Sequence, residues 1–370
     1  MNPSPLPVLM IIPTGIGCSI GGYAGDAIPC ARLLAAASGC LITHPNVMNG
    51  AVLYWSDSRI QYVEGFGIDQ FAVGDILLHP VRQQKIGLLL DAGLEEEIYH
   101  RHVQVAEGCR ASLGLKIGPI IKTDIPLEVD FNHGFSEVSW GGIKHPDALI
   151  RGGEKLKELG ATAIAVVSRF PDDSNDEAFE LYRLGKGVDP FAGAEAVISH
   201  LLVKYLSIPC AHAPALSSLP VSPDIDPRTA AEELGYTFLP SVLVGLSRAP
   251  DLISKYEIQQ NNDFLISSSN YIKVDDLGAV IAPQGGLGGV AVLACLERGI
   301  PLIAVSNPGV LNVTSSSLGI KSDLKLNNLE NCLHVANYIE AAGVVLALRE
   351  GIDISTLKRP LKSVDLDSNF

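Results

Sequence analysis

The stretch that decides the fold is VLMIIPTGIGCSIGGYAGD, residues 8–26, in which an unbroken apolar run leads into a glycine-rich loop. Central parallel strands are buried on both faces and therefore read as continuous apolar runs. The small apolar residues 27–37 predict a helix after the loop, and Cys40–Thr43 predicts a second strand. The stretch therefore predicts a β-α-β unit.

A second glycine-rich stretch near the end of the chain resembles this unit. Residues 22–49 align without a gap on residues 285–312, at a constant offset of 263, and seven positions are identical. Each copy has a glycine loop, an apolar helix, a short apolar strand and a polar corner that contains Pro and Asn. Duplication or quasi-symmetry explains the likeness. Convergence also explains it, because both units need Gly at tight turns.

Strand and helix patterns alternate along the rest of the chain, which predicts an α/β fold. We expect one or more mostly parallel, Rossmann-like sheets that contain both glycine-loop units, either as pseudo-symmetric halves or as separate units. A break in the strand–helix rhythm near 125–145 and a Pro/Ser-rich connection near 214–226 suggest soft boundaries, with an N-terminal unit at 1–124, a central segment at 125–226 and a C-terminal unit at 227–370. These segments form one or two domains, and the first and last could pack together.

Two further patterns predict individual elements. Residues 52–55 and 61–63 alternate apolar with polar side chains, which predicts a hairpin. Residues 329–349 predict a long final helix.

Composition restricts the partners of the protein. Of 370 residues 47% are apolar and 18% are charged, as expected of a well-buried α/β protein. There are 27 Lys and Arg against 41 Asp and Glu, a net charge of −14, and no basic run. Nucleic acid and anionic membrane surfaces are therefore poor partners, and a small anionic molecule would have to be held by backbone N–H groups and a few cations.

Cysteine usage and hydropathy indicate the compartment. The sequence has seven cysteines and no C-x-x-C motif, which argues against a disulfide framework and against a zinc knuckle. Free cysteines favour a reducing compartment. Cys18, inside the first glycine loop, is a candidate reactive thiol. The sequence has no signal-peptide pattern at its start and no apolar run of about 20 residues. We expect a cytoplasmic protein with no membrane partner, and a homo-oligomer, most simply a dimer.

The first glycine loop is a candidate anion-binding site. A glycine-rich loop between a strand and a helix can hold phosphate or carboxylate on its N–H groups. It is not a Walker A loop, and it lacks the third glycine of the dinucleotide fingerprint; His44 stands where an acidic ribose-binding residue is expected. NAD bound in the conventional way is not expected, and packing in a tight turn is the alternative. The candidate ligand-binding residues of this loop are Thr14, Gly15, Gly17, Gly21 and Gly22.

The ionisable residues near predicted strand and helix ends are candidates for proton transfer. Asp26 could instead cap a helix, His133 could be a turn residue, and His212 could be a core histidine. Glu195 lies in an Ala-rich apolar helix, where a buried carboxylate needs a raised pKa or a partner such as Arg183. The candidate catalytic residues are Asp26, His44, His133, Asp189, Glu195, His200 and His212.

Other polar groups are candidates for binding a ligand or a metal. Arg183 and Lys186 offer cations beside a glycine-rich turn. A divalent metal is a candidate cofactor, with His44, His200 and His212 as ligands, although no H-E-x-x-H or H-x₃-H spacing supports it. No other cofactor is indicated. The further ligand-binding candidates are Asn46, Arg183, Lys186, Gly285, Gly286, Gly288, Gly289, Ser306 and Asn307.

Several long strings carry a family resemblance over nearly the whole chain. They include IIPTGIGCSIGGYAGDAIP (11–29), GKGVDPFAGAEAVISH (185–200) and APQGGLGGVAVLACLERGIPLIAVSNPG (282–309). With them the chain resembles a domain-of-unknown-function family known mainly from cyanobacteria and related photosynthetic lineages. The resemblance implies no activity, because none is established for that family.

The residues themselves favour an enzyme that acts on a small anionic metabolite in a cleft between the two glycine loops. Acid–base chemistry of the lyase, isomerase or hydrolase type fits the absence of a nucleophile elbow or cofactor fingerprint. A non-catalytic metabolite sensor is the first alternative. A nucleotide-binding or glycosyl-transfer enzyme is the second, suggested by the loop at 285–289.

Overall fold

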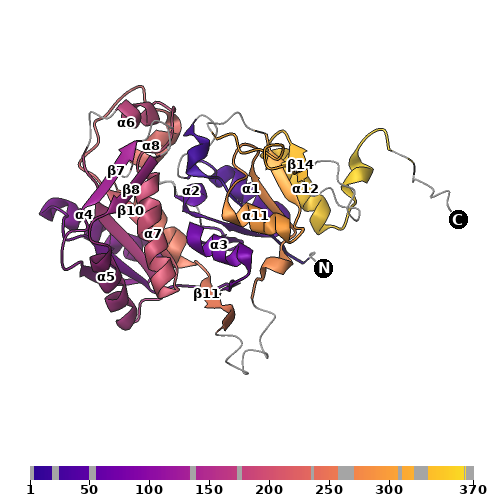
Figure 1. Ribbon diagram of the computed structural model, residues 1–370. Coiled ribbons are helices and arrows are strands. Elements are labelled where there is room, and N and C mark those ends of the chain that lie inside the picture. Colours follow the sequence, from indigo (N-terminus) through magenta and orange to yellow (C-terminus); the bar gives the residue numbers. More distant parts are fainter. Residues whose placement is uncertain are drawn as a thin grey trace.

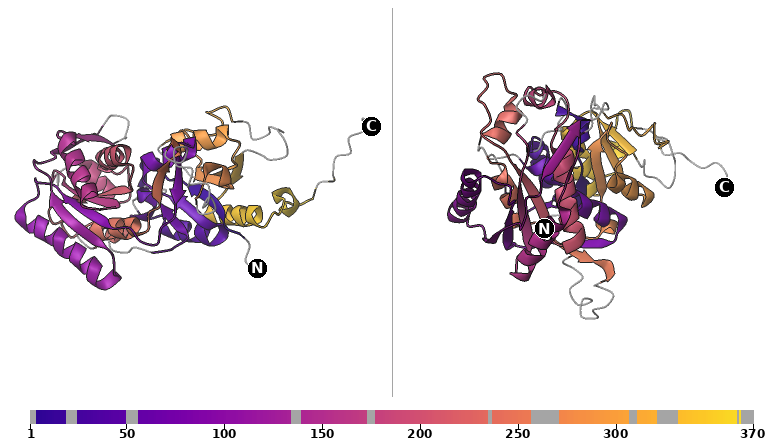
Figure 2. Two further views of the ribbon diagram at one scale, coloured as in Figure 1. Left: turned by 90° about the horizontal axis from the view of Figure 1, so that it is seen from below. Right: turned by 60° about the vertical axis from the view of Figure 1, so that its left-hand side comes forward.

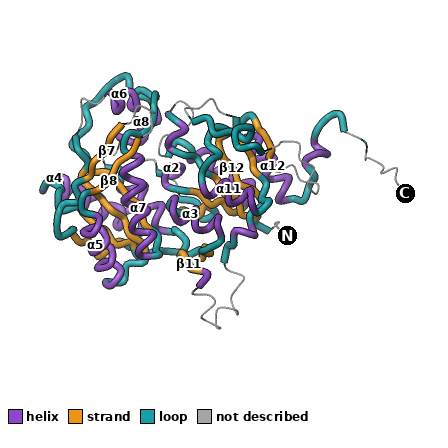
Figure 3. The backbone as a smooth tube through the Cα atoms, in the orientation of Figure 1, coloured by secondary structure: helices purple, strands orange, loops and turns teal. Residues whose placement is uncertain are grey.

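Two α/β lobes make up the protein, and each is built around a parallel sheet (Figure 1). In a second orientation the lobes again lie side by side (Figure 2), and Figure 3 shows the strands of each sheet between helices. The α/β class and the mostly parallel sheets that the sequence predicts are thereby confirmed. This computed structural model describes residues 4–18, 25–49, 56–133, 139–172, 177–234, 237–256, 271–306, 311–320, 332–361 and 363.

The lobe that we call the terminal lobe draws its strands from both ends of the chain. Its six strands are all parallel and lie in the order β14-β13-β12-β1-β2-β3. The chain thus winds outward from the centre of the sheet in both directions. The strands are β1 (Leu6–Met10), β2 (Gly39–Thr43), β3 (Ile60–Tyr62), β12 (Ala279–Pro283), β13 (Leu302–Val305) and β14 (Cys332–Val335).

Helices cover both faces of this sheet. Side chains alternate along β1, so Val8 and Met10 pack on the α1 side and Leu9 packs on the α3 side. One face carries α1 (Ile28–Ser38) and α12 (Tyr338–Arg349), and the other carries α3 (Gly65–Val73) and α11 (Val290–Glu297). The short α2 (Pro45–Met48) follows β2.

The second lobe, here the central lobe, contains a four-stranded parallel sheet in the order β10-β9-β5-β6. Its strands are β5 (Ile86–Leu90), β6 (Ile117–Lys122), β9 (Ala163–Arg169) and β10 (Cys210–Ala215). One face packs against α4 (Glu96–Leu113) and α9 (Leu239–Ser247), the other against α5 (Pro146–Glu158) and α7 (Ala192–Leu206). The hairpin β7 (Val129–His133) and β8 (Ser139–Ile143) lies against α7, and α6 (Glu177–Arg183) and α8 (Pro227–Glu233) complete the lobe.

The chain crosses between the lobes twice, and the two crossings pair with each other. β4 (Ile76–His79) leads from α3 towards β5, and β11 (Asp251–Ser254) leads back from α9. They form an antiparallel pair. The sheets therefore do not follow the predicted segment 1–124, because β5 and β6 of that segment belong to the same sheet as β9 and β10, with β5 paired to β9.

The two glycine units lie in the same sheet, where β1 and β12 separate their strands β2 and β13, and each contains the expected helix and following strand. Strand β13 begins at Leu302, which is 263 residues after Gly39, the first residue of β2. The strands that precede the two helices do not correspond in the same way. Seventeen residues separate β1 from α1, whereas six separate β12 from α11. The likeness is thus limited to helix and strand, and duplication and convergence both remain open.

Of these two element predictions, the hairpin lies partly outside the described residues and the final helix was wrong. Strand β3 pairs in parallel with β2, with Ile60 opposite Leu41, while residues 52–55, the other arm of the expected hairpin, lie outside the described residues. The final helix begins only at Tyr338, because Cys332–Val335 forms the edge strand β14 on β13. In the final segment, pairing with a distant strand outweighs the local pattern.

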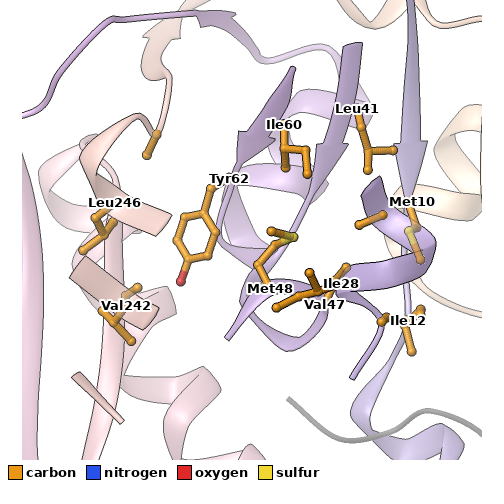
Figure 4. Packing of buried hydrophobic residues seen from close by; sticks show 14 of the residues in the cluster. Met10, Ile12, Ile28, Leu41, Val47, Met48, Ile60, Tyr62, Val242 and Leu246 are labelled. Carbon is orange, nitrogen blue, oxygen red and sulfur yellow. The ribbon is translucent and has the colours of Figure 1, made fainter. Parts of the chain in front are cut away.

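The lobes are joined by apolar packing between β3 and α9. Figure 4 shows the Tyr62 ring pointing towards Val242 and Leu246, with Ile60 and Met48 on its other side. Tyr62 is 4% exposed, and its hydroxyl donates a hydrogen bond to Asn49 Oδ1 at 3.0 Å. Gly245 allows this approach, because a Cβ there would lie 2.6 Å from Tyr62 Cε2.

Replacing Gly245 with Ala should lower the free energy of unfolding by about 1–3 kcal/mol, because the methyl group must displace the Tyr62 ring. Gly343 provides a matched control: it lies on the exposed side of α12, and a Cβ there meets nothing within 4 Å. Gly343→Ala should instead raise the free energy of unfolding by about 0.5–1 kcal/mol. Urea denaturation measures both changes, and effects of the same sign would contradict this packing.

Candidate functional site

A cleft of about 340 Å³ lies between the two lobes, at the carboxyl ends of the terminal-lobe strands. Its terminal-lobe wall follows strands β1, β2 and β3 and the start of α11, and α7 and β10 form the central-lobe wall. The described residues that line it are Ile11, Pro13, Thr14, His44, Pro45, Asn46, Asn49, Glu64, Gly65, Ile68, Asp69, Asp189, Ala192, Glu195, Ala196, Ser199, His200, His212, Gly289 and Ala291.

The topology of the terminal sheet explains this position. β1 and β12 are neighbours at its centre, and the chain leaves them in opposite directions, towards β2 and towards β13. Open α/β sheets bind ligands in the crevice outside such a reversal of strand order. Thr14 follows β1 and Gly289 precedes α11, and both line the cleft at this point. Six of the predicted polar groups also reach it: His44, Asn46, Asp189, Glu195, His200 and His212.

His44 and Asn46 hold the end of β1. The Ile12 N–H donates to His44 Nε2 at 3.0 Å, and Asn46 Nδ2 donates to the Ile12 carbonyl at 2.8 Å. Burial lowers the pKa of His44 to about 4, so its ring is neutral at pH 7. Because Nε2 accepts a hydrogen bond, the ring proton is assigned to Nδ1. Both side chains therefore orient the loop that forms one wall of the cleft.

Asp189 and Glu195 lie together at the beginning of α7. The Asp189 carboxylate accepts a hydrogen bond from Phe191 N at 2.8 Å, and burial raises its pKa to about 6. Among the described residues, no side chain or backbone group bonds to the Glu195 carboxyl. Burial, and then the charge of Asp189, raise the pKa of Glu195 well above its ordinary value. The two groups therefore differ in proton affinity although they line the same cleft.

Glu64 and His200 form a second pair across the lobes. Glu64 Oε1 is 3.1 Å from His200 Nε2, and Glu64 Oε2 accepts from Phe66 N at 2.8 Å at the start of α3. Burial raises the pKa of Glu64 to about 8 and lowers that of His200. Both groups are thus mostly neutral at pH 7, and a proton lies between them.

His212 lies in the middle of β10 and is 4% exposed. Its Nε2 is 2.5 Å from Ser168 Oγ on β9, and its ring centroid is 5.3 Å from that of Phe170. Nδ1 is buried and has no hydrogen-bond partner among the described residues. Burial lowers the pKa of His212 to about 3. A residue that lines the cleft therefore has a buried polar atom without a partner among the described residues.

Glu64 and Asp69 line the cleft but were missed by the sequence analysis. Asp69 Oδ1 accepts from Ala291 N, in the first turn of α11, at 3.1 Å. Glu64 lies two residues after β3, much as His44 follows β2, so an acidic residue after a short strand was the available signal. It was missed because β3 was interpreted as an arm of a hairpin and not as part of the parallel sheet.

Several predicted candidates do not line the cleft. Asp26 Oδ2 is 3.5 Å from Arg228 Nη1. Arg183 is buried, and its Nε donates to Glu233 at 2.9 Å instead of meeting Glu195. Lys186 and Ser306 are exposed. Gly15, Gly17, Gly285, Gly286 and Gly288 are absent from the described lining. Gly21, Gly22, Asn307 and the side chain of His133 lie outside the described residues.

The described glycine loops offer little to an anion. Gly17 N donates to the Thr14 carbonyl, Gly286 N to the Pro283 carbonyl and Leu287 N to the Val313 carbonyl. Asp69 already places a carboxylate on the first turn of α11. None of the described residues that line the cleft is Lys or Arg. These observations do not support the anionic ligand that the sequence suggested.

A metal site is likewise not evident in the described part of the chain. His44, His200 and His212, the predicted ligands, all line the cleft. However, no group of three or more His, Cys, Asp or Glu side chains among the described residues has an arrangement that could hold a metal ion.

Comparison with known proteins finds a family of uncharacterised members. A family model described as "Protein of unknown function (DUF3326)" matches residues 7–358. A relative from Synechococcus sp., named an uncharacterized lipoprotein, is 48% identical over 350 residues, which cover 94% of this chain and 92% of the relative. That name contradicts the expected cytoplasmic location, which is therefore withdrawn. No helix among the described residues is long and apolar enough to cross a membrane.

Proposed function

Because the chain belongs to the DUF3326 family, described as of unknown function, we propose its activity from the cleft: it is an enzyme that transfers protons on a small polar metabolite. Glu195 is the general acid, since burial and the charge of Asp189 raise its pKa and so favour its protonated form. Asp189, with a pKa of about 6, is mostly ionised at that pH and acts as the base. Glu64 and His200 hold a second proton on the opposite wall.

One observation carries this proposal: the carboxyl of the half-buried Glu195 lines the cleft without a side-chain partner among the described residues, and it lies beside the buried carboxyl of Asp189. A buried carboxyl with a purely structural role is normally hydrogen-bonded, because leaving it unpaired costs free energy. Arg183, the structural partner considered for Glu195, is bonded to Glu233 instead. A neutral carboxyl beside an ionised one is the arrangement that acid–base enzymes use to separate the two roles.

The lining narrows the substrate class. Carboxyls and imidazoles dominate its polar groups, and no described lining residue is cationic. A substrate without strong negative charge fits this lining better than the anionic metabolite expected from the sequence. The reaction class stays lyase, isomerase or hydrolase, each of which needs a proton donor and acceptor on one substrate. The sensor remains an alternative, and the dimer remains a prediction.

A nucleotide-binding enzyme is a second candidate. The strand order of the terminal sheet, reversed between β1 and β12, is that of dinucleotide-binding domains. Fold alone does not imply function, however, and neutral His44 stands at the end of β2, where an acidic residue would bind the ribose. The acid–base proposal therefore has the stronger support.

Conversion of metabolites tests the proposal. A small-molecule extract of a cyanobacterium is divided by anion exchange into retained and unretained fractions, and each is incubated with the full chain. Liquid chromatography with mass spectrometry should find one compound consumed in the unretained fraction, with a product that is isomeric, smaller, or larger by one water. Protein unfolded by heat is the control.

The other outcomes separate the alternatives. Retention of a compound by the protein without its conversion would contradict an enzyme and favour the sensor. Conversion of nucleotides alone, in the retained fraction, would favour the nucleotide-binding enzyme.

A further inference from the structure

The cleft continues into a smaller cavity of about 50 Å³ inside the central lobe, which we call the annex. The annex and the cleft share Asn49, Asp189, Glu195 and His212. A ligand in the cleft can therefore extend one end into the annex. About 30 Å³ is the share of one water molecule in the liquid, so the annex has room for a group with one or two heavy atoms.

Four described carboxyls line the annex, and one of them, Glu233, is bonded to Arg183 at 2.9 Å. Of the other three, Asp189 precedes α7, Glu195 lies in the first turn of α7, and Glu232 of α8 accepts the Tyr182 hydroxyl at 2.8 Å and 3.0 Å. Glu232 is 7% exposed, and burial, followed by the charge of Asp189, raises its pKa well above the ordinary value. No described residue that lines the annex is Lys or Arg. A cation that arrives from outside would therefore favour further negative charge here, on Glu232 beside the ionised Asp189.

His212 supplies an independent indication of a ligand. Its Nδ1 is the buried atom without a partner, and the residue lines both cavities. When the ring proton is on Nε2, next to Ser168 Oγ, Nδ1 presents a lone pair. A ligand that donates a hydrogen bond would satisfy this lone pair.

Aromatic rings complete the wall of the annex. Phe179, Tyr182, Phe191 and Phe238 all line it. The ring centroids of Phe179 and Phe191 are 5.5 Å apart. Aromatic faces attract cations and exclude water, which strengthens the attraction between a cation and a carboxylate. Anions gain nothing comparable from such a wall.

We propose that the annex binds the ammonium group of a small primary amine, whose remaining atoms lie in the cleft. The ammonium donates hydrogen bonds to the carboxylate of Glu232 and to Nδ1 of His212, with the aromatic rings around its first carbon. Glu232 releases its proton to solvent when the cation arrives, whereas Glu195 keeps the proton that it donates in the proposed reaction. The inference rests on the proposed function and names the substrate class of the same site.

Calorimetric titration of the full chain at pH 7 tests the inference with three probes of similar size: n-butylamine, n-butanol and butyrate. We expect butylamine to bind at least about 10-fold more tightly than the other two, because only a cation compensates a buried carboxylate. Titrations in buffers of different ionisation enthalpy should also show proton release, because the cation lowers the carboxyl pKa.

Variants test whether butylamine binding and the accompanying proton release occur in the annex. Glu232→Gln and Asp189→Asn should each weaken butylamine binding by about 10- to 100-fold and reduce the proton release. Glu158→Gln is the matched control, because Glu158 is exposed on α5, 3.3 Å from Lys155, and should bind as the wild type does. Thermal melts confirm that each variant is folded, and two independent variants prevent one folding failure from deciding the result.

Three outcomes would overturn the inference: butanol binding as tightly as butylamine, butylamine binding without proton release, or Mg²⁺ binding in place of the amine. Conversion of a metabolite without an amino group would overturn it while leaving the proposed enzyme intact. Amine binding without conversion of any metabolite would support the annex and contradict the enzyme. The two proposals therefore fail separately.

Discussion

Replacing Glu195 with Gln lowers turnover of the metabolite by about 10²- to 10⁴-fold, the usual contribution of a general acid. Gln keeps the shape of the side chain but has no proton to donate. Because the Glu195 carboxyl has no side-chain partner among the described residues, the substitution breaks no hydrogen bond, and the fold should be retained. Turnover measured beside thermal melts tests both halves of the expectation.

The pH dependence of stability gives this variant a second readout. The pKa of Glu195 is raised in the folded protein, so above the ordinary carboxyl pKa of about 4.3 the folded state binds more protons than the unfolded one. The free energy of unfolding of the wild type therefore falls as pH rises from that value towards the folded pKa. Glu195→Gln has no ionisable carboxyl at this position, so its free energy of unfolding does not fall for this reason.

Its melting temperature should thus match the wild type near pH 4 and exceed it increasingly at higher pH. Glu158→Gln, on an exposed face, should show neither the loss of turnover nor the widening difference in melting temperature. Full turnover in Glu195→Gln would contradict the assignment of the acid. A constant difference in melting temperature would contradict the buried, neutral carboxyl.

The sequence predicted the cleft residues that follow from local pattern. His44 and Asn46 come directly after an apolar strand, and the ends of parallel strands meet at one edge of a sheet. Asp189 and Glu195 stand at the start of an apolar helix, where a carboxyl has few structural reasons to be buried. Such residues can be identified without knowing which elements pack together.

Residues whose role depends on distant partners could not be predicted in this way. The sequence predicts that Arg183 binds a ligand, but in the structure α8 places Glu233 beside it, and the two side chains form an ion pair. Lys186 lies on an exposed turn. Glu64 required the knowledge that β3 joins the parallel sheet, and the Glu64–His200 pair required the contact between α3 and α7. Each depends on contacts between segments far apart in the chain, which no local periodicity reports.

His212 shows how the structure changes the size of a predicted effect. From the sequence alone, His212→Ala is expected to lower the free energy of unfolding by about 1 kcal/mol, because the residue stands near the end of a short strand among small neighbours. In the structure it lies in the middle of β10, 4% exposed, against Phe170. Its Nε2 is also paired with Ser168 Oγ, which the substitution would leave without this partner.

We therefore expect His212→Ala to lower the free energy of unfolding by about 2–4 kcal/mol and to abolish turnover. His212→Gln separates the two effects. Its amide can reach Ser168 as Nε2 does, but it provides no atom at the place of Nδ1. His212→Gln should thus recover part of the lost stability in urea denaturation, yet remain as defective as His212→Ala in turnover. If His212→Gln restores turnover, the unpaired Nδ1 has no part in the site, and His212 serves only to join β10 to β9.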